Sequence, residues 1–333
     1  MTIDCYQQLA QALEQGPAVL ATVISVKGST PREVGAKMIL CADGRTFNTI
    51  GGGAGEAKVI HQAIKVLATG EKQFIQIDLS GAPQRETQGI CGGTMQVWLE
   101  RWSGEAAIAL VKQILDLLKS GQTATLVTPF ASEEFPYLLP QAAAIPDLTD
   151  AFVETLQPPP TLLIVGAGHV GEQLAKVASL TGFQIAIQDD RSEWANTQRY
   201  PQASMVFNTS IASTVTQLAN CSQLYAALVT RGYHYDLEAL ESLLKRQPPC
   251  LYIGAIGSEK RVRQVYQAIK TSISQSQLRS LYAPIGLDIG AMTPAEIAVS
   301  ICAELILVRR GGTGRSLSQK LRQGSKPTFS GSA

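Results

Sequence analysis

The sequence predicts an α/β protein in which an N-terminal mixed α+β domain precedes a Rossmann-like domain with a doubly wound parallel sheet. In the second half of the chain, short continuous apolar segments alternate with helix-compatible segments, which is typical of a parallel sheet buried on both faces. In the first half, a hairpin signal and strands of mixed polarity are interspersed with amphipathic helices. The length of 333 residues agrees with two domains, since about 150 residues per domain is usual.

The domain boundary is predicted at Pro158-Pro159-Pro160, because three consecutive prolines form a stiff, extended spacer. Before it, from 131 to 160, prolines interrupt the periodic pattern and weaken it. We therefore assign residues 1–157 to the N-terminal domain and 158–315 to the Rossmann-like domain. Residues 316–333 are polar and contain Gly and Ser, so we expect a disordered tail there.

The elements of the N-terminal half follow from apolar spacing and β-branched runs. In chain order we expect a helix at 6–13, strands at 19–26, 36–40 and 46–50, a helix at 55–67, strands at 74–79 and 92–100, a helix at 108–118 and a strand at 123–127. The second and third strands are expected to form a hairpin, because Asp43-Gly44 supplies the positive φ values of a tight turn.

In the second half of the chain, strand and helix segments alternate more regularly. The strands are expected at 161–165, 183–188, 205–207, 224–230 and 250–256, with helices between them that include one at 172–180. The last helix begins at Thr293-Pro294-Ala295-Glu296, which combines an N-cap hydroxyl, a proline at the first helical position and a carboxylate at the third. Arg309 and Arg310 suit its C-terminal end, and Gly311 ends it. Handedness rules then favour a doubly wound sheet.

The most specific motif is Gly166-Ala167-Gly168-His169-Val170-Gly171, directly after the strand at 161–165. Its glycines would let a pyrophosphate approach backbone N–H groups at the positive end of the following helix. Asp189 and Asp190 end the next strand, about 20 residues on, where a ribose-binding carboxylate is expected. The glycines also serve strand–helix packing, so the motif predicts the fold more strongly than a ligand. The candidate residues for a nucleotide or NAD(P) here are Gly166, Gly168, His169, Gly171, Asp189 and Asp190.

Two further glycine loops lie in the N-terminal half. The segment 50–56 ends a strand and enters a helix, and the segment 89–94 precedes a strand and presents a thiol. Backbone donors without bulky side chains suit an oxyanion or a phosphate-bearing ligand. Cys91 is a candidate for contact with a soft metal or sulfur centre, or else a small packing residue. The candidate cofactor-binding residues here are Gly51, Gly52, Gly53, Glu56, Cys91, Gly92 and Gly93.

Charge and composition exclude several classes of protein. The formal net charge of +1 and the lack of a Lys/Arg-rich run argue against nucleic acid or a membrane surface as partner. No secretory signal and no apolar run of about 20 residues are visible, so we expect a cytoplasmic protein. The six cysteines are scattered without a CxxC pair, which suits a reducing compartment and predicts no metal site.

The sequence shows ligand-binding loops without an evident catalytic apparatus. It has three histidines, His61, His169 and His234, and no GxSxG, HExxH or Walker A motif. A binding protein is therefore favoured over a turnover enzyme. One alternative is an NAD(P)-dependent oxidoreductase that uses the GxGxxG loop, with His169 or His234 as the proton-transfer group. Another is an oligomeric scaffold in which the sheet domain only supplies an interface.

Taken together, the motifs resemble those of the XdhC/CoxI family, the accessory factors that mature xanthine dehydrogenase and related molybdenum hydroxylases. The resemblance spans about residues 1 to 311. The segments that carry it are Gly28-Ser29-Thr30-Pro31-Arg32, Gly51-Gly52-Gly53, Cys91-Gly92-Gly93, Leu162 to Gly171, Asp189-Asp190-Arg191, Tyr252 to Ser258, Ala283 to Gly290 and Thr293 to Ile297.

The resemblance implies a function that composition does not. Members of this family are understood to bind the molybdenum cofactor (molybdopterin), protect it, support its sulfuration with a cysteine desulfurase, and deliver it to an apo molybdenum hydroxylase of the xanthine dehydrogenase type. The resemblance leaves open whether the cargo is plain molybdopterin or a dinucleotide form. Many members carry Cys after the triple glycine where this chain has Ala54, which leaves Cys91 as the candidate thiol. A homodimer is the default expectation for the oligomeric state.

Overall fold

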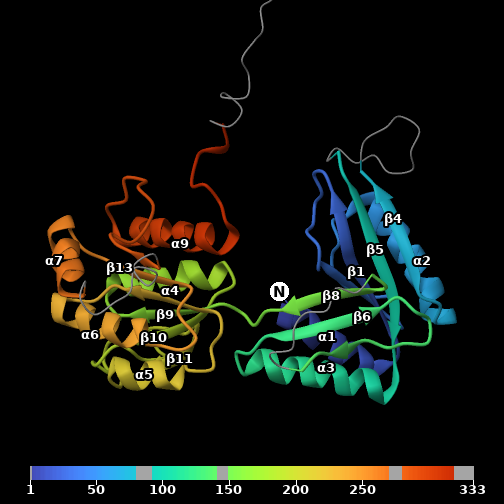
Figure 1. Cartoon of the computed structure of the whole chain (residues 1–333), viewed down its shortest axis with the longest axis horizontal. Coiled ribbons are helices and arrows are strands. Elements are labelled where there is room, and N and C mark those ends of the chain that lie inside the picture. The colour runs from blue at the N-terminus through green and yellow to red at the C-terminus, as the bar shows by residue number, and fades with distance from the viewer. Residues whose placement is uncertain (1, 80–91, 141–148, 270–279, 319–333) are drawn as a thin grey trace, which may run out of the picture. The chain divides into compact units, whose positions relative to one another are not determined.

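The computed structural model describes residues 2–79, 92–140, 149–269 and 280–318 (Figure 1). The chain divides into two compact units, Met1–Pro159 and Pro160–Ala333. The tail expected from residue 316 lies outside the described residues from 319 onward. None of the described helices is long and apolar enough to cross a membrane.

The first unit is built on a five-stranded antiparallel sheet with the order β3-β2-β1-β5-β4. Its strands are β1 (Ala18–Lys27), β2 (Lys37–Cys41), β3 (Thr46–Asn48), β4 (Gln73–Asp78) and β5 (Thr94–Trp102). A second antiparallel sheet, in the order β7-β6-β8, contains β6 (Ala124–Pro129), β7 (Tyr137–Leu138) and β8 (Ala151–Leu156). The hairpin between β2 and β3 is confirmed.

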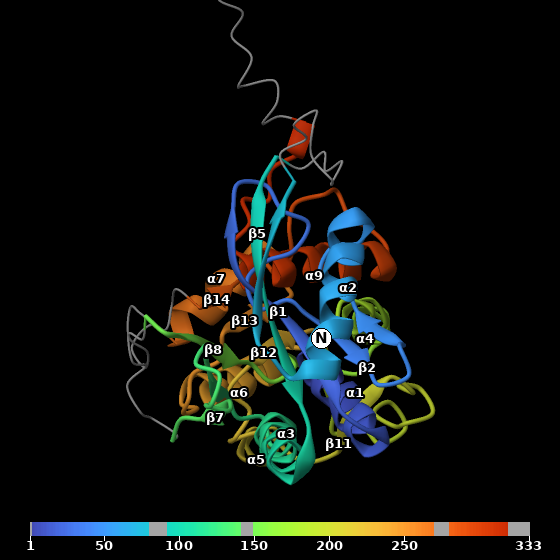
Figure 2. The same cartoon turned by 90° about the vertical axis from the view of Figure 1, so that its right-hand side faces the viewer.

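The helices of this unit cover both faces of the larger sheet (Figure 2). They are α1 (Thr2–Gln15), α2 (Gly53–Thr69) and α3 (Gly104–Lys119). Side chains of β1 alternate between two cores, because successive residues of a strand point to opposite faces. Val19 and Ala21 pack with α2, whereas Ala18 and Leu20 pack with α1 and α3.

The second unit contains a parallel sheet with the order β11-β10-β9-β12-β13-β14. Its strands are β9 (Thr161–Val165), β10 (Gln184–Gln188), β11 (Ala203–Phe207), β12 (Leu224–Leu228), β13 (Tyr252–Ala255) and β14 (Leu281–Tyr282). Counted within the unit, this is the order 3-2-1-4-5-6 of the dinucleotide-binding doubly wound fold. The predicted fold class is therefore confirmed.

Helices cover both faces of this sheet (Figure 1). They are α4 (His169–Leu180), α5 (Ile211–Gln217), α6 (Tyr233–Leu244), α7 (Glu259–Ile269) and α9 (Pro294–Arg310). The apolar sides of α4 and α9 pack together on one face, and those of α5, α6 and α7 pack on the other. The carboxyl ends of the parallel strands thus form one edge, where the loops into α4, α5 and α6 begin.

The structure adds three strands to those expected and shifts several boundaries by two or three residues. β7 and β14 were not expected because each has only two residues, and β8 was not expected because it is partly exposed and lies in the segment that prolines interrupt. The helix expected from Glu172 begins at His169, so Gly171 lies in its first turn. Residues 229–230, expected at the end of a strand, follow β12 as a loop.

The N-terminus of α9 is closed by the predicted capping box. The Thr293 hydroxyl accepts from the Glu296 N–H at 3.3 Å, and Glu296 Oε2 accepts from the Thr293 N–H at 2.9 Å. Thr293→Ala should therefore lower the free energy of unfolding by about 1 kcal/mol. Urea denaturation measures this change, with Ser242→Ala on the exposed side of α6 as the control. Equal effects of the two substitutions would contradict a capping role.

Candidate functional site

Three segments that are distant in the sequence meet at one end of the larger sheet in the first unit. A Cβ on Gly93 would collide with the carbonyl oxygen of Ser29, and a Cβ on Gly51 would collide with the Pro31 ring. A Cβ on Gly28 would lie 3.1 Å from the Cα of Gly93. The segments 28–32, 51–53 and 92–93 therefore form one assembly, which we call the glycine cradle.

Part of the glycine cradle is open. Among the described residues, and apart from the adjoining chain, no atom lies within 4 Å of a Cβ built on Gly52, Gly53 or Gly92. Residues 51–54 are all exposed, and α2 begins among them. The first N–H groups of a helix have no partner within the helix and carry partial positive charge. The cradle thus combines open space with backbone donors, which suits an anionic ligand.

The Glu56 carboxylate holds the loop 49–52 of the cradle through hydrogen bonds. Its Oε2 accepts from the Thr49 hydroxyl at 2.5 Å and from the backbone N–H groups of Ile50 and Gly52, each at 3.1 Å. This carboxylate oxygen already accepts three hydrogen bonds from the loop. We therefore assign Glu56 a positioning role. Cys91, the candidate thiol, lies outside the described residues, whereas Gly92 and Gly93 pair with Leu79 through backbone hydrogen bonds.

In the second unit, the GxGxxG loop joins β9 to α4, and its three glycines differ in their surroundings. Gly166 has φ +106°, and a Cβ there would lie 2.6 Å from the Val229 carbonyl oxygen. A Cβ on Gly171 would collide with the Gly166 carbonyl oxygen. A Cβ on Gly168 would meet no atom within 4 Å. Gly166 and Gly171 thus permit close packing, and Gly168 leaves space for a ligand.

Asp189 does not have the surroundings of a free ribose-binding carboxylate. It is 5% exposed and accepts four hydrogen bonds: from the Ala167 N–H at 2.8 Å, and from the N–H, Nε and guanidinium terminus of Arg191. Burial alone would raise its pKa, but the hydrogen bonds from Arg191 and Ala167 outweigh burial and lower the pKa to about 2. Asp189 therefore ties the GxGxxG loop to the end of β10.

Asp190 is the more accessible carboxylate at this edge. Its side chain is 56% exposed and pairs with Arg231 at 2.9 Å. The Arg231 guanidinium also lies 4.3 Å from the centre of the Tyr235 ring and donates to the Tyr235 hydroxyl. On the other side of the loop, the His169 ring packs edge-on against Trp194, with 5.9 Å between ring centres.

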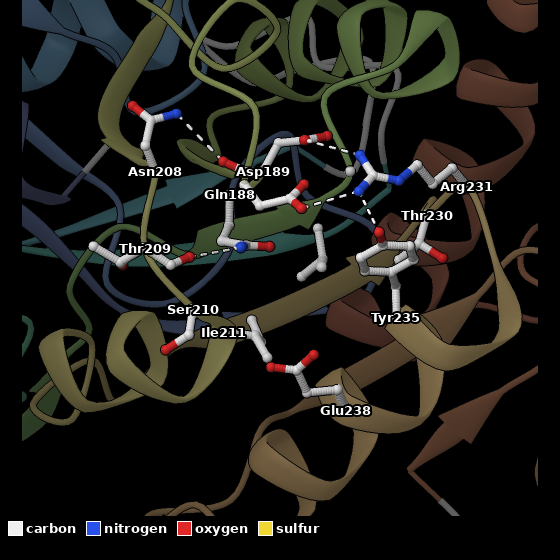
Figure 3. Close-up of a pocket in the computed structure, with 13 residues that line it drawn as sticks. Gln188, Asp189, Asn208, Thr209, Ser210, Ile211, Thr230, Arg231, Tyr235 and Glu238 are labelled. Atoms are coloured by element: carbon white, nitrogen blue, oxygen red, sulfur yellow. Dashed lines mark hydrogen bonds and ion pairs between the residues drawn. The ribbon is translucent and has the colours of Figure 1, made fainter.

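A cavity of about 290 Å³ opens at the carboxyl ends of β9, β10 and β12 (Figure 3). Its walls come from the ends of these strands, the loop from β11 into α5, and the first turns of α6. Gly166, Asp189 and Asp190 are among its lining residues. Neither His169 nor His234 lines it. The cavity thus has no histidine among its lining residues that could transfer a proton.

The fold and these features define a two-unit α/β protein with a glycine cradle in one unit and a cavity in the Rossmann sheet of the other. Residues 12–78 match the XdhC and CoxI family, and residues 162–305 match the XdhC Rossmann domain. The chain belongs to the XdhC/CoxI family.

Relatives of known name agree with this assignment. A probable xanthine dehydrogenase subunit from Bacillus subtilis is 27% identical over 325 residues, covering 89% of this chain and 94% of that protein. The molybdenum cofactor insertion chaperone PaoD of Escherichia coli is 23% identical over 307 residues, which cover 90% of this chain and 86% of that protein. The uncharacterized protein YqeB of Escherichia coli is 25% identical over 315 residues, and the chain spans about half of its length, 47%.

A solved structure also covers nearly the whole chain. It is described as a xanthine dehydrogenase from Bacillus halodurans, and it superimposes with a TM-score of 0.75 at 26% identity. The match covers 96% of this chain and 99% of that chain. Both units of this protein therefore have counterparts in that structure.

Proposed function

We propose that this chain is an accessory factor that binds the molybdenum cofactor as cargo and delivers it to an apo molybdenum hydroxylase of the xanthine dehydrogenase type. The observation that carries the proposal is the glycine cradle, in which segments 28–32, 51–53 and 92–93 come together and leave the surroundings of Gly52, Gly53 and Gly92 open. The family and the similarity to PaoD support it. The cradle is expected to hold plain molybdopterin or a dinucleotide form by the same contacts.

The residues of the cradle fit the chemistry of a phosphorylated pterin. The N–H groups at the start of α2, from Gly53 and Ala54, suit the phosphate, and Arg32 is exposed on the neighbouring segment. Gly52 and Gly92 have open surroundings among the described residues, and we propose that the pterin ring lies beside them. In this proposal Glu56 keeps the loop in its binding conformation rather than contacting the cargo.

The proposal extends to sulfur chemistry through Cys91. Burial raises the pKa of the Cys5 and Cys250 thiols to about 11, so these two are protonated at neutral pH. Cys91 precedes Gly92 in the sequence and is the thiol we assign to cofactor contact, since Ala54 supplies none. We further propose that the chain protects the cofactor, supports its sulfuration with a cysteine desulfurase, and acts as a homodimer in the cytoplasm.

Binding of molybdopterin under anaerobic conditions tests the proposal. Protein mixed with molybdopterin and then desalted should retain the pterin, measured by its fluorescence after oxidation. Gly52→Asp should reduce retention at least about tenfold, because a carboxylate would occupy the cradle and repel the phosphate. Gly44→Asp is the matched control, since Gly44 also has positive φ and open surroundings but lies in the β2–β3 turn. A wild-type protein that emerges without pterin would refute the proposal.

The alternative function is an NAD(P)-dependent oxidoreductase. The strand order and the open position at Gly168 favour it. The four donors on Asp189 and the lack of a histidine on the cavity wall weigh against it. Calorimetric titration with NAD(H) and NADP(H) separates the two: micromolar binding together with failure to retain molybdopterin would favour the oxidoreductase.

A further inference from the structure

The last helix of the second unit, α9, carries apolar residues on its outer side as well as on its buried side (Figure 1). Ala298, Ile301 and Leu305 belong to the core shared with α4 and are fully buried. Four other apolar positions fall within about 80° of arc at 3.6 residues per turn. This outer stripe consists of Ala295, Val299, Ala303 and Ile306, which are exposed or half-buried. Because a helix that is apolar on all sides is normally buried, the outer stripe indicates a partner.

The outer stripe is uncharged and lies between two charged residues of opposite sign. Glu296, in the first turn of α9, and Arg310, its last residue, are both exposed. The other two charged residues of the helix are held by the fold of the second unit. Glu304 is 8% exposed, and the Arg309 guanidinium lies 4.8 Å from the centre of the Phe183 ring. The stripe thus has an acidic end and a basic end.

The two charges are placed symmetrically about Ala303. Glu296 lies seven residues before Ala303 and Arg310 seven residues after it. Seven residues make nearly two full turns and about 10 Å of helix, so all three residues lie on nearly the same side. A two-fold axis at Ala303 would therefore place Glu296 of each copy level with Arg310 of the other. Val299 would lie within one residue of Ile306 along the helix axis, and the small side chain of Ala303 allows a close approach.

We propose that the outer stripe of α9 pairs with the outer stripe of a second copy of this chain, antiparallel and about a two-fold axis at Ala303. The arrangement forms the pair between Glu296 and Arg310 twice and sets the two helix dipoles in opposite directions. A parallel arrangement would bring like charges together, so the charges favour the antiparallel one. The inference rests on the homodimer of the proposed function and assigns the surface that forms it.

Exposed apolar residues lie beyond both ends of α9. Ile289 and Met292 come before the helix and are 54% and 86% exposed, and Leu317 comes after it and is 76% exposed. In an antiparallel pair, the segment before α9 of one copy lies at the same end as the segment after α9 of the other. The pairing therefore brings these apolar side chains toward one another, which favours their removal from water.

Sedimentation of the full chain over a range of concentrations tests the inference. The wild type should be a dimer at micromolar concentration. Val299→Glu should raise the dissociation constant at least about tenfold, because the new carboxylate enters an apolar interface twice. Ile108→Glu is the matched control: Ile108 is 48% exposed on α3 of the first unit, as Val299 is 49% exposed on α9, and its substitution should leave the constant unchanged. A monomeric wild type, or equal effects of the two substitutions, would overturn the inference.

Cross-linking tests the position of the two-fold axis. Ala303→Cys places two thiols side by side at the axis, so a mild oxidant such as copper phenanthroline should join two chains by a disulfide. Ala295→Cys should give no more cross-linked dimer than the wild type, because the axis places it level with Gly311 of the other copy. The wild type measures the background from the native cysteines. Equal yields from the two variants, or no yield above background from Ala303→Cys, would overturn the antiparallel pairing.

Two measurements separate this interface from the proposed cofactor site. Val299→Glu should retain molybdopterin within about twofold of the wild type, and Gly52→Asp should remain a dimer, because the two substitutions lie in different units. A wild type that loses the pterin but dimerises would refute the cofactor proposal and leave this inference standing. A wild type that retains the pterin as a monomer would overturn this inference alone.

Discussion

Gly171→Ala should destabilise the second unit by about 3 kcal/mol, whereas Gly168→Ala should cost less than about 1 kcal/mol. In the first variant the new methyl group collides with the Gly166 carbonyl oxygen, and neither backbone segment can move without separating α4 from β9. In the second variant the methyl group enters open space, and the φ of −77° at Gly168 suits any residue. Urea denaturation of the full chain measures both changes.

The same two variants should show the opposite order in binding. Gly168→Ala keeps the fold but places a methyl group where the phosphate of NAD(P) would lie in the oxidoreductase alternative, so in that case it should weaken the binding of NAD(P) while leaving stability almost unchanged. Equal stability losses in the two variants would contradict the division of roles among the glycines. All three glycines of the GxGxxG motif would then be required for packing.

The fold was predictable from local sequence, because its strands carry continuous apolar runs. Leu162 to Val165 and Leu224 to Leu228 are buried on both faces, and that burial requires the apolar runs that the sequence shows. β14 has two residues and left no such run to recognise. Helix bounds were less predictable, since α4 starts at His169 within the glycine motif.

The sites were predictable only in part, because their chemistry depends on contacts between distant segments. The spacing of Asp189 indicated a ribose contact, but spacing does not show that the side chain turns inward to Ala167 and Arg191. Glu238 lies on a helix face like many solvated acids, and only the cavity distinguishes it from Glu241. Gln188, a polar residue that ends the apolar strand β10, was not singled out from the sequence, although it lines the same cavity.

The inward turn of Asp189 leads to a prediction about acid stability. Because its folded-state pKa, about 2, lies below the ordinary 3.8, the charged form stabilises the fold. This contribution, about 2 kcal/mol, is complete above about pH 4 and is lost as the pH falls through about 2.

Asp189→Asn should therefore lower the free energy of unfolding by about 2 kcal/mol at pH 7, and the difference from wild type should shrink as the pH approaches 2. Asn keeps an acceptor for the Ala167 N–H, so the loss reports the charge rather than the hydrogen bond. Asp190→Asn is the matched control: its side chain is 56% exposed, and it should change stability by less than about 0.5 kcal/mol. Thermal or urea unfolding between pH 2 and pH 7 measures both. A pH-independent difference for Asp189→Asn would mean that its ion pair with Arg191 contributes nothing, and that the loop is held by packing at Gly166 and Gly171 alone.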